Sequence, residues 1–335
     1  MLAQSDDNDP FAPLAAAVVR RYGTAARIEN FRIPTLGGSN RTIVFDLVEG
    51  ASRRKLVSRQ ATYVASNNPF IPTSVQFRVM RTAWRHHIPV PEPVFEYDEA
   101  DGMGEGFVSA FVTGETRPTR IQAMLRESGG GDALAAQLGT LMGKLHCMPT
   151  EDFALLEQVD DSRNALKAQL DRYDSYGEIR PAIEFGLRWL ERNAPPARTR
   201  SFVHGDFRLG NFMVQEGEIT ALLDWECAHL GDPTEDIGWL CTRSWRFGRP
   251  DLELAGVSHP APFLDAYRAV TGVRPDADEL RYWQIFGLVR WAILNIMQAE
   301  AHVRGERIGV VFAACGRNTA LVEYDLMMTL AGRYP

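Results

Sequence analysis

The sequence lacks an apolar run that approaches the ~18 residues of a membrane-spanning helix. It has no excess of basic residues, and its formal net charge of -7 argues against general nucleic-acid binding. Its four cysteines are scattered without a CxxC pair, which indicates reduced thiols. The polar, acidic stretch at residues 5–9 is unlike a secretory signal. We therefore expect a cytoplasmic globular protein with neither a nucleic-acid nor a membrane partner.

Acidic residues are absent from residues 51–91, although the chain as a whole contains 43 of them. The same stretch contains seven arginines and lysines. No element formed there can supply a carboxylate to pair with a neighbouring cation. This local absence bears on the site predicted below.

The 335 residues suffice for about two domains. The first third contains five short strand-like runs and one helical pattern, Thr73 to His86, whereas the pattern beyond Gly114 is mainly helical. We therefore predict an α+β protein. Residues 1–113 would form a lobe with a five-stranded antiparallel sheet, residues 114–335 a helical lobe, and residues 107–114 a hinge.

The most informative motif reads His204-Gly-Asp206-Phe-Arg-Leu-Gly-Asn211, and Asp224-Trp-Glu follows thirteen residues after it. Each motif comes after a short apolar run typical of a strand. A glycine-containing turn at residues 215–218 joins two of these runs as a hairpin. The pattern predicts two carboxylates and an amide at the ends of neighbouring strands.

Phosphoryl transfer is the chemistry that these residue types suit. The reaction needs a group that orients or deprotonates the attacking hydroxyl, and oxygen ligands that hold magnesium on the phosphates. Asp206 is the candidate base, and Asn211 and Asp224 are the candidate magnesium ligands.

These residues resemble the aminoglycoside phosphotransferase-like family of the protein-kinase-like superfamily, most closely a subgroup associated with acyl-CoA dehydrogenases. The resemblance implies a two-lobed kinase fold with a nucleotide-binding N-terminal lobe. It gives His204 a scaffolding role and places Asp236 where it would bond the catalytic-loop backbone. It also places Arg208 where protein kinases carry a lysine that contacts the transferred phosphate. A surface ion pair is the alternative for Arg208.

The turn Gly37-Gly38-Ser39-Asn40 lies between two strand-like runs. Its backbone N–H groups and its serine hydroxyl can cover phosphates, and the family has a comparable turn there. An ordinary hairpin turn is the alternative. The resemblance also implies that the hinge backbone, from Ser109 to Phe111, contacts adenine.

The phosphate anchor of the N-terminal lobe departs from the family pattern. The family carries a lysine on the third strand and a glutamate on the following helix. Here Arg59 takes the lysine position and Gln76 the glutamate position. Arginine is a planar, always charged phosphate ligand, so we expect Arg59 to hold phosphates and to bond Gln76 in place of the salt bridge.

Residues 237–250 contain three arginines and two tryptophans but no acid. In the implied fold this region lies near the acceptor cleft. Aminoglycosides are polycations that need acidic walls, so a cationic, aromatic wall suits an anionic acceptor better. We predict acceptor contacts from Arg243, Trp245, Arg246 and Arg290. A surface helix with solvated arginines is the alternative.

The resulting hypothesis is an ATP- and magnesium-dependent phosphotransferase acting on a hydroxyl of a small molecule, such as a hydroxyacyl-CoA. GTP is the alternative nucleotide, and an antibiotic is the alternative acceptor. The missing lysine–glutamate pair raises another alternative, a pseudokinase that binds nucleotide without turnover. The sequence predicts no oligomeric state.

Overall fold

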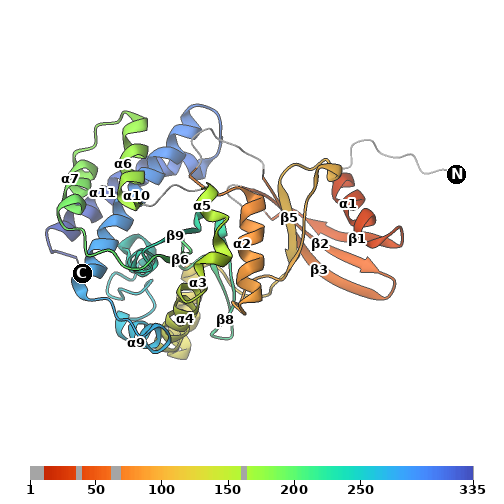
Figure 1. Cartoon of the computed structure of the whole chain (residues 1–335), viewed down its shortest axis with the longest axis horizontal. Helices are drawn as coiled ribbons and strands as arrows, with labels where there is room; N and C mark the ends of the chain where they lie inside the picture. The colour runs from red at the N-terminus through yellow and green to blue at the C-terminus, as the bar shows by residue number, and fades with distance from the viewer. Residues whose placement is uncertain (1–10, 35–39, 62–68, 160–163, 335) are drawn as a thin grey trace. The chain divides into compact units, whose positions relative to one another are not determined.

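The computed structural model describes residues 11–34, 40–61, 69–159 and 164–334. It divides into two compact units, Met1–Thr113 and Gly114–Pro335. The first is built around a sheet and the second is mainly helical (Figure 1). The α+β class predicted from the sequence is confirmed.

The sheet of the N-terminal unit has the strand order β1-β2-β3-β5-β4, and neighbouring strands are antiparallel. All five expected strands are present. Strands β2 and β3 pair without a break from Asn40 opposite Ala61 to Glu49 opposite Ser52, beside the hairpin turn. The strands are β1 (Ala26–Arg32), β2 (Asn40–Glu49), β3 (Ser52–Ala61), β4 (Pro93–Glu96) and β5 (Gly106–Ala110).

Two helices flank this sheet. Helix α1 (Ala12–Tyr22) packs Leu14 and Val18 into a core with strand residues that include Phe45. Helix α2 (Thr73–Arg85) packs near β4 and β5. Its Phe77 ring lies 5.5 Å from the ring of Phe107.

The helical unit contains nine α-helices among its described residues. Figure 1 shows α6, α7, α10 and α11 gathered in one group, while α4 packs on α9 in another. The helices are α3 (Pro118–Ser128), α4 (Gly131–His146), α5 (Leu156–Val159), α6 (Ala165–Tyr176), α7 (Pro181–Arg192), α8 (Thr234–Cys241), α9 (Pro260–Thr271), α10 (Ala277–Val303) and α11 (Val310–Leu330).

Two short strand pairs interrupt these helices. Strands β7 (Phe212–Gln215) and β8 (Glu218–Leu222) form the predicted hairpin. Both of its turn residues have positive φ, 53° and 85°, as a two-residue type I′ turn requires. Strand β6 (Ser201–Val203) pairs instead with β9 (His229–Gly231), a partner that sequence patterning did not reveal.

Among the described helices, none is both long and apolar enough to cross a membrane. One helix boundary was predicted wrongly. The apolar positions of residues 237–246 predict a helix that continues to Arg246, but α8 ends at Cys241. Thr242 leaves the helical conformation with ψ of 136°, and a short 3₁₀ turn covers Arg243–Arg246.

Candidate active site

The carboxylate of Asp206 lies at the centre of the site. Its Oδ2 accepts a hydrogen bond of 2.6 Å from Asn211 Nδ2. Its Oδ1 accepts bonds of 2.9 Å from Arg208 Nε and from Trp239 Nε1. The amide of Asn211 also donates to the backbone carbonyl of Asp206 at 2.8 Å, which closes the loop between them. N–H groups on three side chains therefore fix the orientation of this carboxylate.

Asp236 anchors the backbone of the catalytic loop. Its two carboxylate oxygens accept bonds of 2.8 Å from the N–H groups of His204 and Gly205. Its side chain is fully buried. Burial by itself would raise the pKa of Asp236, but the bond from His146 and the backbone N–H of His204 hold it below its ordinary value. The ionised carboxylate thus holds two consecutive loop N–H groups.

The glycine of the motif is required by its position. Gly205 has φ of 76°, and a Cβ added there would lie 2.3 Å from the carbonyl oxygen of Cys227. A larger residue would therefore face both backbone strain and a clash with main-chain atoms.

His204 lies in the interior with both ring nitrogens engaged. Nε2 lies 3.0 Å from the carbonyl oxygen of Leu223, to which it donates, and Nδ1 accepts from the Asp206 N–H at 3.3 Å. This pairing requires the neutral ring. Burial lowers the pKa of His204 and so favours the same state. The ring supports the loop and presents no free nitrogen to a substrate.

A second buried network, centred on Arg290, also holds the catalytic loop. Arg290 of α10 donates from Nη1 to the carbonyl oxygen of Gly205 at 2.5 Å. The same nitrogen lies 3.7 Å from Glu235 Oε1, and the guanidinium lies 4.8 Å from the centroid of the Trp239 ring. Glu235 Oε2 in turn lies 3.1 Å from His229 Nε2. The prediction that Arg290 faces the acceptor is corrected, because its cation is committed to the loop.

Asn211 and Asp224 are the two candidate magnesium ligands. The Leu223 N–H donates to the Asn211 carbonyl at 2.8 Å, so Asp224 follows directly beside the start of β7. The left-handed backbone of Asp224, with φ of 64°, is uncommon outside glycine and is typical of functional positions. Because Asn211 Nδ2 is bonded to Asp206, its amide oxygen is the atom left for a cation.

Carboxylate and amide oxygens are the ligands that magnesium prefers, so these side chains fit the metal. No group of three or more His, Cys, Asp or Glu side chains able to hold a metal exists within the described part of the chain. The pair formed by Asn211 and Asp224 would therefore share the ion with phosphate oxygens and water, as is usual for magnesium.

The predicted cationic acceptor wall does not form as expected. Arg246 is 2% exposed, and its guanidinium donates to the carbonyls of Cys241 and Pro250. Arg243 pairs with Asp325 at 3.3 Å. Trp245 is buried, with the guanidinium of Arg208 4.7 Å from its ring centroid. Arg243 and Arg246 therefore make contacts within the helical unit, and α8 ends before both of them.

In the N-terminal unit, Arg59 lies on the sheet face that α2 covers. It stands opposite Phe107 in the antiparallel register, so the two side chains share a face. The expected bond between Arg59 and Gln76 is wrong. Gln76 Nε2 donates to the Ile71 carbonyl at 2.9 Å, and Gln76 Oε1 is buried without a hydrogen-bond partner among the described residues.

The remaining nucleotide predictions concern the glycine turn and the hinge. Gly37, Gly38 and Ser39 lie outside the described residues, and Asn40 begins β2. At the hinge, the Phe111 N–H donates to the Lys55 carbonyl at 3.0 Å. That N–H is therefore engaged within the sheet, and a contact of the remaining backbone atoms of Ser109 to Phe111 with adenine stays a prediction. Ser109 is buried within β5.

Sequence reasoning missed several supporting residues. His146, Glu235 and His229 carried no recognisable motif. His146 reaches Asp236 across 90 residues, whereas His229 and Glu235 are only six residues apart. Trp239 was noted only as part of the presumed wall. A signal existed for it, because it follows Asp236 by three residues, and that spacing places both side chains on one helical face.

Known proteins with similar sequences indicate the family of this chain. Residues 37–283 match the phosphotransferase enzyme family. Acyl-CoA dehydrogenase family member 11 of Gallus gallus is 26% identical over 245 residues, which cover 69% of this chain and 28% of that protein. The chain spans less than a third of the length of its leading curated relatives.

Solved structures show the same two-lobed, kinase-like fold. A Ralstonia eutropha protein, provisionally named an aminoglycoside phosphotransferase, has a TM-score of 0.72 at 22% identity over 96% of this chain and 98% of its own. A thermostable mutant of aminoglycoside phosphotransferase APH(4)-Ia, in complex with AMP-PNP and hygromycin B, has a TM-score of 0.60 at 17% identity over 95% and 98%.

Proposed function

Because this chain belongs to the phosphotransferase enzyme family, we propose that it transfers a phosphoryl group from ATP to a hydroxyl of a small molecule. The observation that carries the proposal is the Asp206 carboxylate, which Asn211, Arg208 and Trp239 hold in one orientation. A carboxylate held in this way can orient an attacking hydroxyl and accept its proton.

The proposed roles of the other residues follow from their chemistry. Asn211 and Asp224 would hold magnesium, which neutralises charge on the phosphates. Arg208 is 25% exposed at its side chain and would contact the transferred phosphate. We assign nucleotide binding to the unit Met1–Thr113. Within that unit, Arg59 would contact the phosphates of the nucleotide. The complex of a structural neighbour with AMP-PNP supports ATP as the donor.

We further propose a hydroxyacyl-CoA as the acceptor. The names of the curated relatives, which are acyl-CoA dehydrogenase family members, support this class. An aminoglycoside is the second candidate, which the names of the structural neighbours favour.

The test is ATP turnover with magnesium across a panel of hydroxyacyl-CoAs and aminoglycosides. Asp206→Asn is the control, and we expect it to lower turnover by about 10²–10⁴-fold, the usual loss when a general base is removed. ATP binding without Asp206-dependent transfer to any acceptor would indicate a pseudokinase. Transfer to aminoglycosides alone would leave the reaction class standing and reject the acyl-CoA acceptor.

A further inference from the structure

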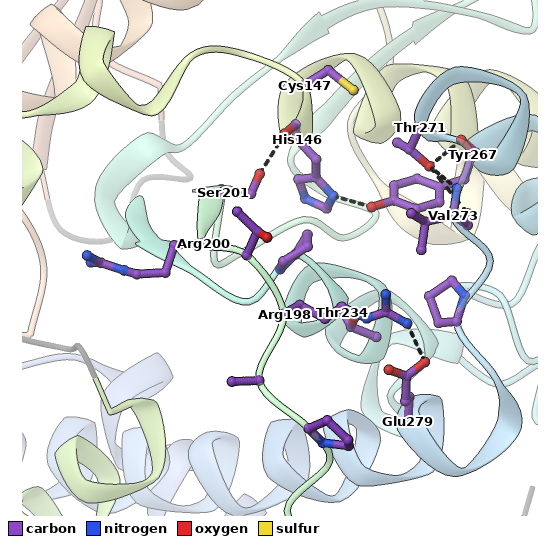
Figure 2. A pocket seen from close by; sticks show the side chains of 15 residues that line it. His146, Cys147, Arg198, Arg200, Ser201, Thr234, Tyr267, Thr271, Val273 and Glu279 are labelled. Atoms are coloured by element: carbon purple, nitrogen blue, oxygen red, sulfur yellow. Dashed lines mark hydrogen bonds and ion pairs between the residues drawn. The ribbon is translucent and has the colours of Figure 1, made fainter.

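A cavity of about 580 Å³ in the helical unit is bounded by the end of α4, the segment 196–201 and the start of α8 (Figure 2). The arginines and the glutamate that line it are already paired. Arg198 Nη2 lies 2.6 Å from Glu279 Oε2. Arg200 points away from the cavity (Figure 2) and reaches Glu157 Oε1 at 2.7 Å and the Leu230 carbonyl at 3.0 Å. The surface that lacks a partner lies elsewhere in this unit, on α11.

Helix α11 is apolar on two opposite sides. On its inner side, Val322 and Leu326 are buried in the core that α11 shares with α7 and α10. On its outer side, Val310 is 86%, Leu321 is 58% and Tyr324 is 54% exposed. A helix that is apolar all round is normally buried, whereas a surface helix carries charged and polar residues on its outer side. The outer face of α11 therefore lacks a cover within the described part of the chain.

The exposed apolar surface continues beyond the start of α11. The turn between α10 and α11 leaves Val303, Ile308 and Val311 highly exposed. Apolar side chains that are scattered singly on a surface need no explanation, but a contiguous patch marks an interaction site. The whole outer face of α11, together with this turn, is such a patch.

The sizes of the side chains change along the outer face. After Val310, the first half carries small side chains and the second half carries large ones. The small residues are Ala313, Ala314 and Ala320, and the large residues are Leu321, Tyr324 and Met327. All of these are exposed, and they recur at spacings of three, four or seven residues, so they share one side of the helix. This face fits a partner that is large where the face is small, and small where it is large.

A second copy of the same helix meets this requirement when it runs antiparallel. Two copies related by a twofold axis present the same face to each other with opposed chain directions. Full overlap of residues 310–331 places the axis between Ala320 and Leu321. The small half of each helix then lies against the large half of the other, and Ala313 comes level with Met328 of the partner subunit. A parallel pair would set alanine against alanine, which leaves voids where interfaces need close packing.

The charge on the outer face also favours the antiparallel pair. Glu323 and Asp325 are paired with arginines of the same subunit, whereas Arg317 has no ion pair among the described residues. In the antiparallel arrangement Arg317 comes level with Tyr324 of the partner subunit, whose ring can receive the guanidinium. A parallel pair would bring the two copies of Arg317 together, and like charges repel.

We propose that the outer face of α11 is a dimer interface, in which two copies of this chain pair α11 with α11 antiparallel about a twofold axis near Ala320 and Leu321. One helix and its adjoining turn supply fewer residues than the about 20–30 a side of a standard interface. The dimer is therefore of micromolar affinity, and its population depends on concentration. Asp206, Asn211 and Asp224 lie outside α11, so association can be measured without turnover.

Sedimentation-velocity ultracentrifugation of the full chain measures the association over about 1–100 μM, the range in which a micromolar dimer dissociates. We expect a mass that rises with concentration from that of one chain, 37.5 kDa, toward twice that value. A single-chain mass at every concentration would overturn the proposal and leave the face to a different protein or to a further domain.

Leu321→Glu locates the interface. The side chain is more than half exposed, so the subunit should tolerate the change, but two carboxylates would meet near the axis in an apolar interface. We expect association at least tenfold weaker. Met124→Glu is the matched control, because Met124 is an exposed apolar side chain on α3, and it should associate like the wild type. Far-ultraviolet circular dichroism checks that each variant is folded. Equal association of the wild type and Leu321→Glu, or an equal loss in both variants, would reject the interface.

Two cysteine variants test the antiparallel register, in a Cys147→Ser background because Cys147 is exposed. Ala320→Cys brings two thiols together near the axis, within the reach of a disulfide. Ala313→Cys is the matched control, since it is another exposed alanine on the same face. Its two copies would lie about 22 Å apart along the helices, at about 1.5 Å per residue.

Mild oxidation should therefore cross-link the Ala320→Cys protein and spare the Ala313→Cys protein, as read on a non-reducing gel against the Cys147→Ser background. Cross-linking of both variants at the same rate, or of neither, would contradict the antiparallel pair.

Discussion

The indole N–H of Trp239 donates a hydrogen bond of 2.9 Å to Oδ1 of Asp206. Trp239 lies on α8, three residues after Asp236, which accepts bonds from two N–H groups of the catalytic loop. One short helix therefore fixes both the backbone of the loop and the carboxylate that the loop presents. Trp239 is thus a positioning residue for the proposed base.

Replacing Trp239 by phenylalanine should lower kcat while leaving the KM for ATP within about twofold. The ring contacts are largely kept, and the bond to the carboxylate is lost. A hydrogen bond to a charged group contributes about 1.5–3 kcal/mol, which corresponds to about a tenfold to hundredfold loss in rate. Steady-state kinetics with the accepted substrate would measure it.

Trp245→Phe is the matched control for this variant. Its ring centroid lies 5.1 Å from that of Trp239, and its Nε1 is buried without a hydrogen-bond partner among the described residues. The same substitution there removes no bond, so kcat should change little. Equal losses in the two variants would contradict the positioning role and indicate disrupted packing instead.

Asp236→Asn should destabilise the helical unit. The carboxylate accepts two backbone N–H bonds and lies 3.2 Å from His146 Nε2. An amide would turn a donor toward one of these partners inside a fully buried site. Losing acceptors in a buried network should lower the free energy of unfolding by about 2–4 kcal/mol, measured by chemical denaturation.

Asp232→Asn serves as the control for that variant. The Asp232 side chain accepts a bond of 2.8 Å from the Thr234 N–H at the start of α8. Asparagine caps helices as well as aspartate does, so the loss should stay below about 1 kcal/mol. A comparable loss in both variants would contradict the anchoring role assigned to Asp236.

The parts of the site that the sequence could reveal are those set by local geometry. The bond from Asn211 to Asp206 spans five residues, and the hairpin turn at residues 215–218 is a two-residue type I′ turn. Both follow from spacing and turn chemistry alone. Strand and hairpin patterns within the N-terminal unit were predictable for the same reason.

The supporting contacts could not be predicted in this way. Arg290 reaches the Gly205 carbonyl across 85 residues, and His146 reaches Asp236 across 90. An arginine in a sequence looks alike whether it faces solvent or a buried carbonyl. The arginines at 243 and 246 were therefore assigned to an acceptor wall, although the early end of α8 turns them into the protein.

Gln76→Glu tests the unusual phosphate anchor. The Nε2 group of Gln76 donates to the Ile71 carbonyl, while Oε1 is buried without a partner among the described residues. A carboxylate there has no proton for Ile71, so we expect the free energy of unfolding to fall by about 2–3 kcal/mol. Thermal and chemical denaturation would measure the change.

Introducing Gln76→Glu into an Arg59→Gln variant completes a double-mutant cycle for these two positions. If the two side chains do not meet, the effects of the two substitutions should add. A different result would show that Arg59 reaches position 76. In that case Gln76→Glu would raise the free energy of unfolding when Arg59 is present, and this gain would be lost in the Arg59→Gln background. The family-type ion pair would then form in this protein once its carboxylate is supplied.

His229 should make stability depend on pH. Its Nδ1 lies 3.0 Å from the Cys227 carbonyl and its Nε2 lies 3.1 Å from Glu235. Both partners are acceptors, so only the protonated ring satisfies them. Burial alone would lower the pKa of His229, but the neighbouring Glu235 carboxylate raises it to about 9.

A histidine whose pKa is raised on folding stabilises the folded protein. This stabilisation is complete at pH values below the ordinary histidine pKa of about 6.5, and it is lost as the pH rises through about 9. The full contribution is about 3 kcal/mol. Stability of the wild type relative to His229→Gln should therefore be greatest near pH 6 and fall between pH 6.5 and 9. Urea denaturation across this range measures it, with His259→Gln, at an exposed ring, as the control. A constant difference between wild type and His229→Gln from pH 6 to 9 would show that the ring is not charged in the folded protein.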